Sequence, residues 1–161
     1  MKVRVGILVF FALTAVACSA LKQAALEPIK VEGHAMEPAL REGDRIFVNR
    51  RLDKLERGDI VILYYPFEPS KSYIKRIVGL PREAVEIREG KVLINGKSLD
   101  EPYVVPDNNR ASFDRKEVKI PEESYYVLGD NRDNSSDSRI WGTLQRKFIY
   151  GKFVKKYYAA N

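Results

Sequence analysis

The sequence predicts a mainly β protein, with antiparallel sheets of short strands behind one apolar N-terminal helix. Two observations favour this fold class. Short runs of β-branched and aromatic residues recur along the chain and are separated by turns that contain Gly, Asn or Pro. No helical period continues beyond the N-terminal segment. Short strands divided by turn signals are typical of all-β barrels and sandwiches.

The N-terminal segment predicts a membrane anchor. Lys2 and Arg4 precede a run of 17 residues, Val5–Leu21, that contains no charged side chain. Such a run is at the lower limit for a helix that spans a bilayer, and the two basic residues would hold its N-terminus in the cytoplasm. We therefore expect a single-pass transmembrane anchor over residues 1–26 and an extracytoplasmic β domain over residues 27–161.

Two other interpretations of this segment remain open. Ala15-Val16-Ala17 forms a small-residue cleavage site after an apolar core, as in a secretory signal. Cys18 follows it directly and resembles the attachment site of a bacterial lipoprotein, in which case the domain is lipid-anchored at this residue. All three interpretations export the domain from the cytoplasm.

Alternation of apolar residues and β-propensity predict the strands of the exported domain. The apolar run 60–65 suits a strand that is buried on both faces. Pro66, Pro69 and Ser70 predict a loop, and residues 101–112, which hold two prolines, predict an exposed one. Strands are expected at residues 29–31, 45–49, 60–65, 73–78, 85–88, 91–94, 125–128 and 148–154, with turns at 41–44, 57–59, 89–90 and 95–96.

Composition excludes several functional classes. Hydrophobic residues make up 45% of the chain and charged residues 31%, which is typical of a folded globular domain. The net charge of +6 is modest and unclustered, and no basic stripe carries interleaved aromatics, so no nucleic-acid partner is expected. Cys18 is the single cysteine, which excludes an intrachain disulfide and a thiolate metal cluster. We predict no cofactor and no metal.

Four stretches of the chain resemble, in the same order, the signature boxes of type I signal peptidases (bacterial leader peptidases). They are Val31-Glu32-Gly33-His34-Ala35-Met36-Glu37-Pro38-Ala39-Leu40, Arg57-Gly58-Asp59-Ile60-Val61, Tyr73 to Pro81, and Gly129 to Gly142. That family consists of membrane-anchored serine proteases with a Ser/Lys dyad. The resemblance implies a signal-peptidase-like β domain that removes N-terminal signal peptides from exported preproteins through an acyl-enzyme.

The resemblance also implies the site residues. A serine hydroxyl needs a base to take its proton, and a lysine can serve only where desolvation lowers its pKa from about 10.4. Lys75 is implied as this general base, and Ser135 as the residue that orients its amine. Asp137 and Arg139 would pair to hold the loop, with Asp130 in the same support. The residues implied to line apolar substrate pockets are Val31, Met36, Tyr73 and Ile74.

Ala35 stands where the family has its nucleophilic serine. Alanine has no hydroxyl, so no acyl-enzyme forms there, and we predict that the chain is catalytically inactive unless serine is restored. An engineered Ser→Ala change and natural divergence both explain the alanine. Ala39, Arg82-Glu83 and Gln145 also depart from the family pattern, which favours natural divergence.

Two functional hypotheses result. The first is a signal-peptidase-type protein of the bacterial cytoplasmic membrane, whose partners are the signal peptides of exported preproteins and membrane lipid. The alternative is a pseudoenzyme, a non-catalytic homologue that holds signal peptides or a partner protein in the same cleft without cutting them. A cleavage assay distinguishes the two hypotheses, whereas a binding assay supports both.

Overall fold

The structure is a computed structural model that describes residues 26–111 and 114–160. Apart from Leu26, the expected anchor over residues 1–26 lies outside the described residues, as does Cys18. Within the described ranges, no helix is long and apolar enough to cross a membrane.

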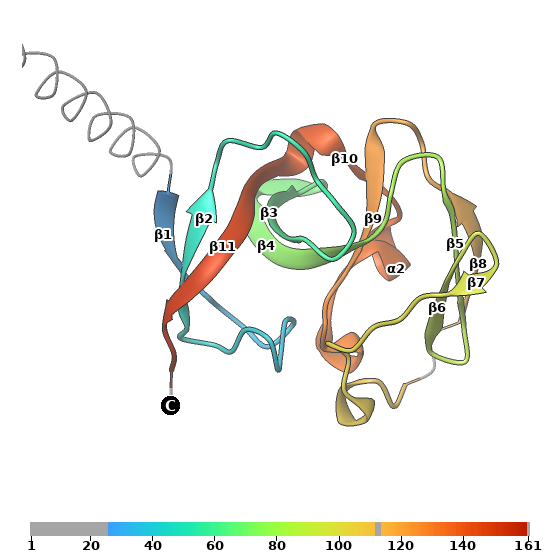
Figure 1. Cartoon of the computed structure of the whole chain (residues 1–161), viewed down its shortest axis with the longest axis horizontal. Helices are drawn as coiled ribbons and strands as arrows, with labels where there is room; N and C mark the ends of the chain where they lie inside the picture. Colours follow the sequence, from blue (N-terminus) through green and yellow to red (C-terminus); the bar gives the residue numbers. More distant parts are fainter. Residues whose placement is uncertain (1–25, 112–113, 161) are drawn as a thin grey trace, which may run out of the picture.

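Two antiparallel sheets make up the fold, which confirms the predicted mainly β class (Figure 1). The larger sheet has the strand order β1-β2-β11-β3-β4-β9-β10, and the smaller has the order β7-β6-β5-β8. The larger sheet contains β1 (Leu26–Lys30), β2 (Arg45–Asn49), β3 (Ile60–Tyr65), β4 (Glu68–Gly79), β9 (Ser124–Leu128), β10 (Leu144–Gln145) and β11 (Ile149–Tyr158). The smaller sheet, at the right of Figure 1, contains β5 (Ala84–Arg88), β6 (Lys91–Ile94), β7 (Lys97–Ser98) and β8 (Arg115–Lys119). Short helical segments connect the strands: η1 (Pro106–Asn108), η2 (Arg132–Asn134), α2 (Ser138–Trp141) and η3 (Arg146–Phe148).

Strand β3 lies at the centre of the larger sheet and is buried on both faces from Ile60 to Leu63, as its apolar run predicted. Successive side chains of a strand point to opposite faces. Val61 and Leu63 belong to one core cluster, together with Ile77, Val127 and Leu144. Ile60 and Ile62 belong to another, together with Val31, Met36, Leu40, Ile46 and Val48. The second cluster fixes the residues around position 35 to the sheet.

Gly79 ends β4 where the two sheets meet. A Cβ atom at this position would lie 2.4 Å from Cδ1 of Ile120, 2.6 Å from Cγ2 of Val85 and 2.9 Å from Cβ of Tyr126. These neighbours belong to one core cluster that contains residues of both sheets. The absence of a side chain at Gly79 therefore permits the close contact between the two sheets.

The hairpins of the smaller sheet confirm the turn predictions. Residues Glu89 and Gly90 have φ angles of 50° and 73°, and Asn95 and Gly96 have 50° and 76°. Two successive positive φ angles are the geometry of tight hairpin turns, in which Asn and Gly are favoured.

The prediction of a loop at Pro66, Pro69 and Ser70 is wrong for Pro69 and Ser70, because β4 already begins at Glu68. Pro69 falls in the register shift between Tyr64 and Tyr65 of β3, where the ladder is irregular. A proline is tolerated at such a position because no ladder hydrogen bond depends on its missing N–H.

Of the loop predicted at residues 101–112, the described residues 101–111 form a loop that contains η1, but the expectation that it is exposed is wrong for its anchoring residues. The side chain of Glu101 is only 10% exposed and pairs with Arg132. Asn108 and Asn109 donate hydrogen bonds to the carbonyl oxygens of Glu37 and Gly90. This loop therefore joins the smaller sheet to the first and last sequence motifs.

We expect Gly79→Ala to lower the free energy of unfolding by about 1–3 kcal/mol, because overpacking forces rigid neighbours apart. Urea denaturation of the variant and the parent measures the change. Lys97→Thr on the exposed strand β7 is the control, with an expected change within about 0.5 kcal/mol. Equal stability of the two variants would contradict the tight contact between the sheets.

Candidate active-site groove

A groove of ≈ 430 Å³ lies between β1 with its following turn on one side and the middle of β4 on the other. All four predicted pocket residues line it, as do Ala35 and Lys75. The complete lining is Ile29, Lys30, Val31, Glu32, Gly33, His34, Ala35, Met36, Ile62, Ser72, Tyr73, Ile74, Lys75, Asn134, Ser136 and Tyr150.

The groove is bordered by an edge of β4 that has no strand partner among the described residues. The segment Ser72–Lys75 of β4 pairs with β3 on one side. The pairing of β4 with β9 on its other side begins only at Arg76. An extended peptide can add to an unpaired strand edge through its main-chain groups. The groove is therefore suited to an extended polypeptide segment.

The side-chain amine of Lys75 lines this groove and has a lowered pKa. The residue is only 3% exposed, and its Nζ donates a hydrogen bond to the carbonyl oxygen of Ile74 at 3.0 Å. Nζ also lies 5.0 Å from the centroid of the Tyr73 ring. Burial lowers the pKa of Lys75 to about 8, although the carboxylate of Asp137 acts in the opposite direction. A substantial fraction of these amines is thus neutral at mildly alkaline pH.

Ala35, which lines the groove, is held in place by its backbone. Its carbonyl oxygen accepts a hydrogen bond from the amide of Asn131 at 3.1 Å. On its C-terminal side, the amide of Leu40 donates to the carbonyl oxygen of Met36 at 2.9 Å, and both side chains are buried in the core. The position of residue 35 is therefore fixed by the core below it and by the loop that contains Asn131.

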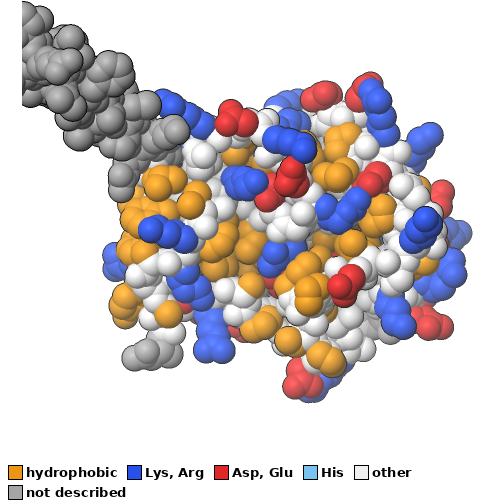
Figure 2. Space-filling view, in the orientation of Figure 1, with side chains coloured by type: hydrophobic (Ala, Val, Ile, Leu, Met, Phe, Trp, Pro, Cys, Tyr) orange, Lys and Arg blue, Asp and Glu red, His pale blue; other side chains and the backbone are white. Residues whose placement is uncertain are grey.

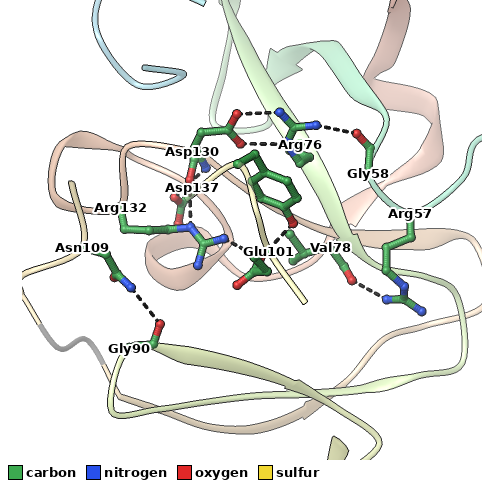
Figure 3. Close-up of polar contacts among 12 residues, drawn as sticks. Arg57, Gly58, Arg76, Val78, Gly90, Glu101, Asn109, Asp130, Arg132 and Asp137 are labelled. Atoms are coloured by element: carbon green, nitrogen blue, oxygen red, sulfur yellow. Dashed lines mark hydrogen bonds and ion pairs between the residues drawn. The ribbon is translucent and has the colours of Figure 1, made fainter. Parts of the chain in front are cut away.

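That loop, residues 129–139, is stabilised by three pairs of arginine and carboxylate. Figure 3 shows Arg76 with Asp130 and Arg132 with Glu101. Arg76 contacts both carboxylate oxygens of Asp130 at 2.8 and 2.6 Å. The carboxylate of Glu101 lies 2.6 Å from Arg132 Nη2. Burial raises the pKa of Asp130, while its bonds to Arg76 oppose this shift. Bidentate and buried pairs of this kind hold a loop in one geometry.

The predicted pairing of Asp137 with Arg139 is present. Arg139 Nε lies 2.9 Å from Oδ1 of Asp137, and Oδ2 of Asp137 accepts a hydrogen bond from the amide of Gly129 at 3.1 Å. Asp137 is fully buried. The pair therefore ties the start of the loop to its end.

Ser135 does not make the expected hydrogen bond to the lysine amine. Its Oγ is buried and has no hydrogen-bond partner within the described residues. It lies beside Gly129, where an added Cβ would be 2.3 Å from Ser135 Oγ and 2.5 Å from the carbonyl oxygen of Ala35. Because Gly129 has no side chain, Ser135 Oγ and the carbonyl oxygen of Ala35 can both lie close to its backbone.

Sequence reasoning did not assign a site role to several residues that the structure brings together. Arg76 follows Lys75 directly, but its contact with Asp130 is 54 positions away along the chain, and Glu101 lies outside all four motifs. No pattern in the sequence indicates such pairs. Within the described ranges, no group of three His, Cys, Asp or Glu side chains is placed to hold a metal ion.

Comparison with known proteins identifies the family. The model of the family described as signal peptidase, peptidase S26, matches residues 3–158. The chain belongs to this family. It is 40% identical over 141 residues to signal peptidase I S of Bacillus subtilis (strain 168), covering 79% of this chain and 75% of that protein. It is 42% identical over 142 residues to a signal peptidase I of Bacillus amyloliquefaciens, covering 80% and 72%.

A solved structure of a signal peptidase I shares the fold of this chain. The crystal structure of a signal peptidase I from Enterococcus faecalis V583 matches with a TM-score of 0.55 and 33% sequence identity. The match covers 63% of this chain and 98% of that chain. The resemblance based on four motifs is therefore confirmed at the level of the family and its fold.

We expect Lys75→Met to stabilise the protein below pH 8. The folded-state pKa of about 8 is lower than the ordinary value of 10.5, so the unfolded state binds more protons between these values and the stability of the parent rises with pH. At pH 6 the variant should be more stable by on the order of 2–3 kcal/mol, and the difference should shrink towards pH 10.5.

Urea unfolding of both proteins at pH 6, 8 and 10 measures this difference. Lys91→Met, on an exposed side chain, is the matched control and should show no comparable gain at pH 6. A Lys75→Met variant that is no more stable than its parent at pH 6 would contradict a desolvated ammonium.

Proposed function

We propose that this chain is a signal-peptidase-type protein whose groove binds the signal peptides of exported preproteins. With Ala35 at the position of the nucleophile it is catalytically inactive, and with serine there it is a Ser/Lys endopeptidase. The observation that carries this proposal is the buried amine of Lys75, with its lowered pKa, in the groove that Ala35 also lines.

The groove accounts for recognition of an extended substrate. The free edge of Ser72–Lys75 pairs with the substrate backbone, and the side chains of Val31, Met36, Tyr73 and Ile74 form small apolar pockets. Such pockets accept the small residues that precede a signal-peptide cleavage site. Val31 and Met36 are 2% exposed and also belong to the core, so the pocket walls on this side are rigid.

With serine at position 35, Lys75 would act as the general base. The serine Oγ attacks the carbonyl carbon of the scissile bond, and its proton passes to the neutral Nζ of Lys75. The amide N–H of residue 35 donates to the oxyanion. Lys75 then returns the proton to the leaving amine, and water hydrolyses the ester. Asp130, Ser135, Asp137 and Arg139 support the loop next to these groups.

A binding function without catalysis is the second candidate. Ala35 itself favours it, because alanine offers no proton to Lys75 and no atom to acylate. In this case the same groove holds a signal peptide or the extended segment of a partner protein without cutting it.

The proposed location is the extracytoplasmic side of the bacterial cytoplasmic membrane. Lys2 and Arg4 would keep the start of a single-pass anchor over residues 1–26 in the cytoplasm, with lipid attachment at Cys18 as the alternative. Exposed Val154, Tyr157 and Tyr158 of β11 support contact with lipid. Hydrophobic side chains also gather among Lys and Arg on the left half of the face in Figure 2, over the region of β1, β2 and β11.

We expect Ala35→Ser to cleave a preprotein with an Ala-x-Ala site, whereas the chain as written does not. Adding Lys75→Met to the Ala35→Ser variant should slow cleavage at least about 10³-fold, because general base catalysis is lost. Gel analysis of the cleaved preprotein measures both. If Ala35→Ser is inactive but still binds the signal peptide, the binding function is favoured. Cleavage by the chain as written would refute the assignment of position 35.

The activity of the Ala35→Ser variant should depend on pH through Lys75. Only the neutral amine accepts a proton, and its pKa is about 8. We therefore expect kcat/KM to rise about tenfold per pH unit below that value and to level off above it. A fluorogenic peptide assayed between pH 6 and 10 gives the profile. A rate that is flat across pH 6–9 would exclude Lys75 as the base.

A further inference from the structure

The loop between β7 and β8 reaches from the smaller sheet to both segments that hold residue 35. We call residues 99–111 the strap. Asn108 Nδ2 donates to the carbonyl oxygen of Glu37 at 3.3 Å. At its other end, the backbone amides of Arg110 and Ala111 each donate to the carboxylate of Asp133 at 2.9 Å. The strap therefore bridges the turn after Ala35 and the loop 129–139.

Glu101 makes the most buried of these connections (Figure 3). Its carboxylate lies 2.6 Å from Nη2 of Arg132, and the side chains are 10% and 2% exposed. Arg132 in turn donates from Nε to the carbonyl oxygen of Gly129 at 3.0 Å. Gly129 packs against the carbonyl oxygen of Ala35. A continuous chain of contacts thus runs from Glu101 to residue 35.

Tyr103 links the strap to a second ion pair. Its hydroxyl donates to Oε1 of Glu101 at 2.9 Å, and its ring centroid lies 4.0 Å from Cζ of Arg76. Arg76 holds both oxygens of Asp130. Burial and the charge of Glu101 raise the pKa of Tyr103, so its hydroxyl keeps the proton that it donates.

Glu101 differs from the other anchoring residues of the strap because its carboxylate neutralises the charge of buried Arg132. Among the three arginine–carboxylate pairs, Asp130 and Asp137 are supplied by the loop 129–139 itself. The carboxylate for buried Arg132 comes from the strap. Removal of one partner leaves an uncompensated buried charge, which is strongly unfavourable. The loop 129–139 therefore reaches its charge-balanced geometry only with the strap in place.

We propose that Glu101 is a positioning residue, which acts through Arg132 and Gly129 to hold the backbone of residue 35 in register with Lys75. The strap contributes no residue to the lining of the groove. Its effect should consequently be on the reacting geometry and not on the affinity for the peptide. This inference rests on the proposed function, and it has one test that needs no catalysis.

The kinetic test uses Ala35→Ser as the parent. Adding Glu101→Gln should lower kcat by about 10–100-fold, as expected for a small displacement of a reacting group, while KM changes by less than about threefold. Tyr103→Phe removes only the O–H donor to Glu101 and should lower kcat in the same direction by a smaller factor. Glu86→Gln is the control: this half-buried acid on β5 pairs with Arg88, outside the strap and the loop 129–139, so the substitution should leave both constants unchanged.

The second test measures amide exchange in the chain as written. The amide of Asn131 donates to the carbonyl oxygen of Ala35, so its exchange rate reports directly on the contact that the strap maintains. Glu101→Gln should accelerate exchange at Asn131 at least about tenfold more than at buried Ile120, whose amide donates to the carbonyl oxygen of Glu83. Glu86→Gln should not change the ratio of the two rates.

The outcomes separate this inference from the proposed function. Inactivity of Ala35→Ser refutes the proposed catalysis, and the exchange experiment still decides on the strap. An active Ala35→Ser parent whose kcat is unaffected by Glu101→Gln, or equal acceleration at Asn131 and Ile120, overturns the positioning role. If Glu101→Gln does not fold, Tyr103→Phe is judged by the same two criteria.

Discussion

The site depends on the burial of a single amine. Lys75 is 3% exposed, and within the described residues no carboxylate lies within ion-pair distance of its Nζ. A buried ammonium without a paired anion is unfavourable, so burial shifts the equilibrium towards the neutral amine and lowers the pKa to about 8. The neutral form is the one that the proposed base chemistry needs. The carbonyl oxygen of Ile74 and the ring of Tyr73 orient the amine without neutralising its charge by an ion pair. Placing Lys75 on β4, which is paired with β3 along this segment, gives the side chain a rigid support.

Unlike Lys75, the three arginines that stabilise the loop 129–139 each form an ion pair with a carboxylate. Arg132 and Arg139 are buried and the side chain of Arg76 is 12% exposed; each has a carboxylate 2.6 to 2.9 Å away. A guanidinium stays charged in any case. These pairs fix the geometry of the loop 129–139, whereas Lys75 remains free to change its protonation state. The division of roles follows from the residue types, because lysine shifts its pKa on burial and arginine does not. It also explains why a loop from the smaller sheet matters to a groove in the larger one, since Glu101 supplies one of the anions.

Much of the fold could be predicted from residue patterns. The apolar run of β3 and the Asn95-Gly96 turn identify their elements because side-chain alternation and positive φ angles are local properties. Strand β8 was not predicted, because its sequence Arg-Lys-Glu-Val-Lys is polar and the strand lies at an exposed edge. The start of β4 was placed too late because Pro69 is a loop signal by itself, and only the irregular pairing with β3 accommodates it.

The sequence by itself determined the family, the β class, and the candidate roles of Lys75 and position 35, because motif spacing and residue chemistry are contained in the chain. It also showed that position 35 has no hydroxyl. Only the tertiary structure decided which charges meet: Arg76 with Asp130, and Arg132 with Glu101. It also decided that Ser135 Oγ lies beside Gly129 without a hydrogen-bond partner among the described residues. Such contacts join residues far apart in the chain and depend on how two sheets pack, so no local pattern specifies them.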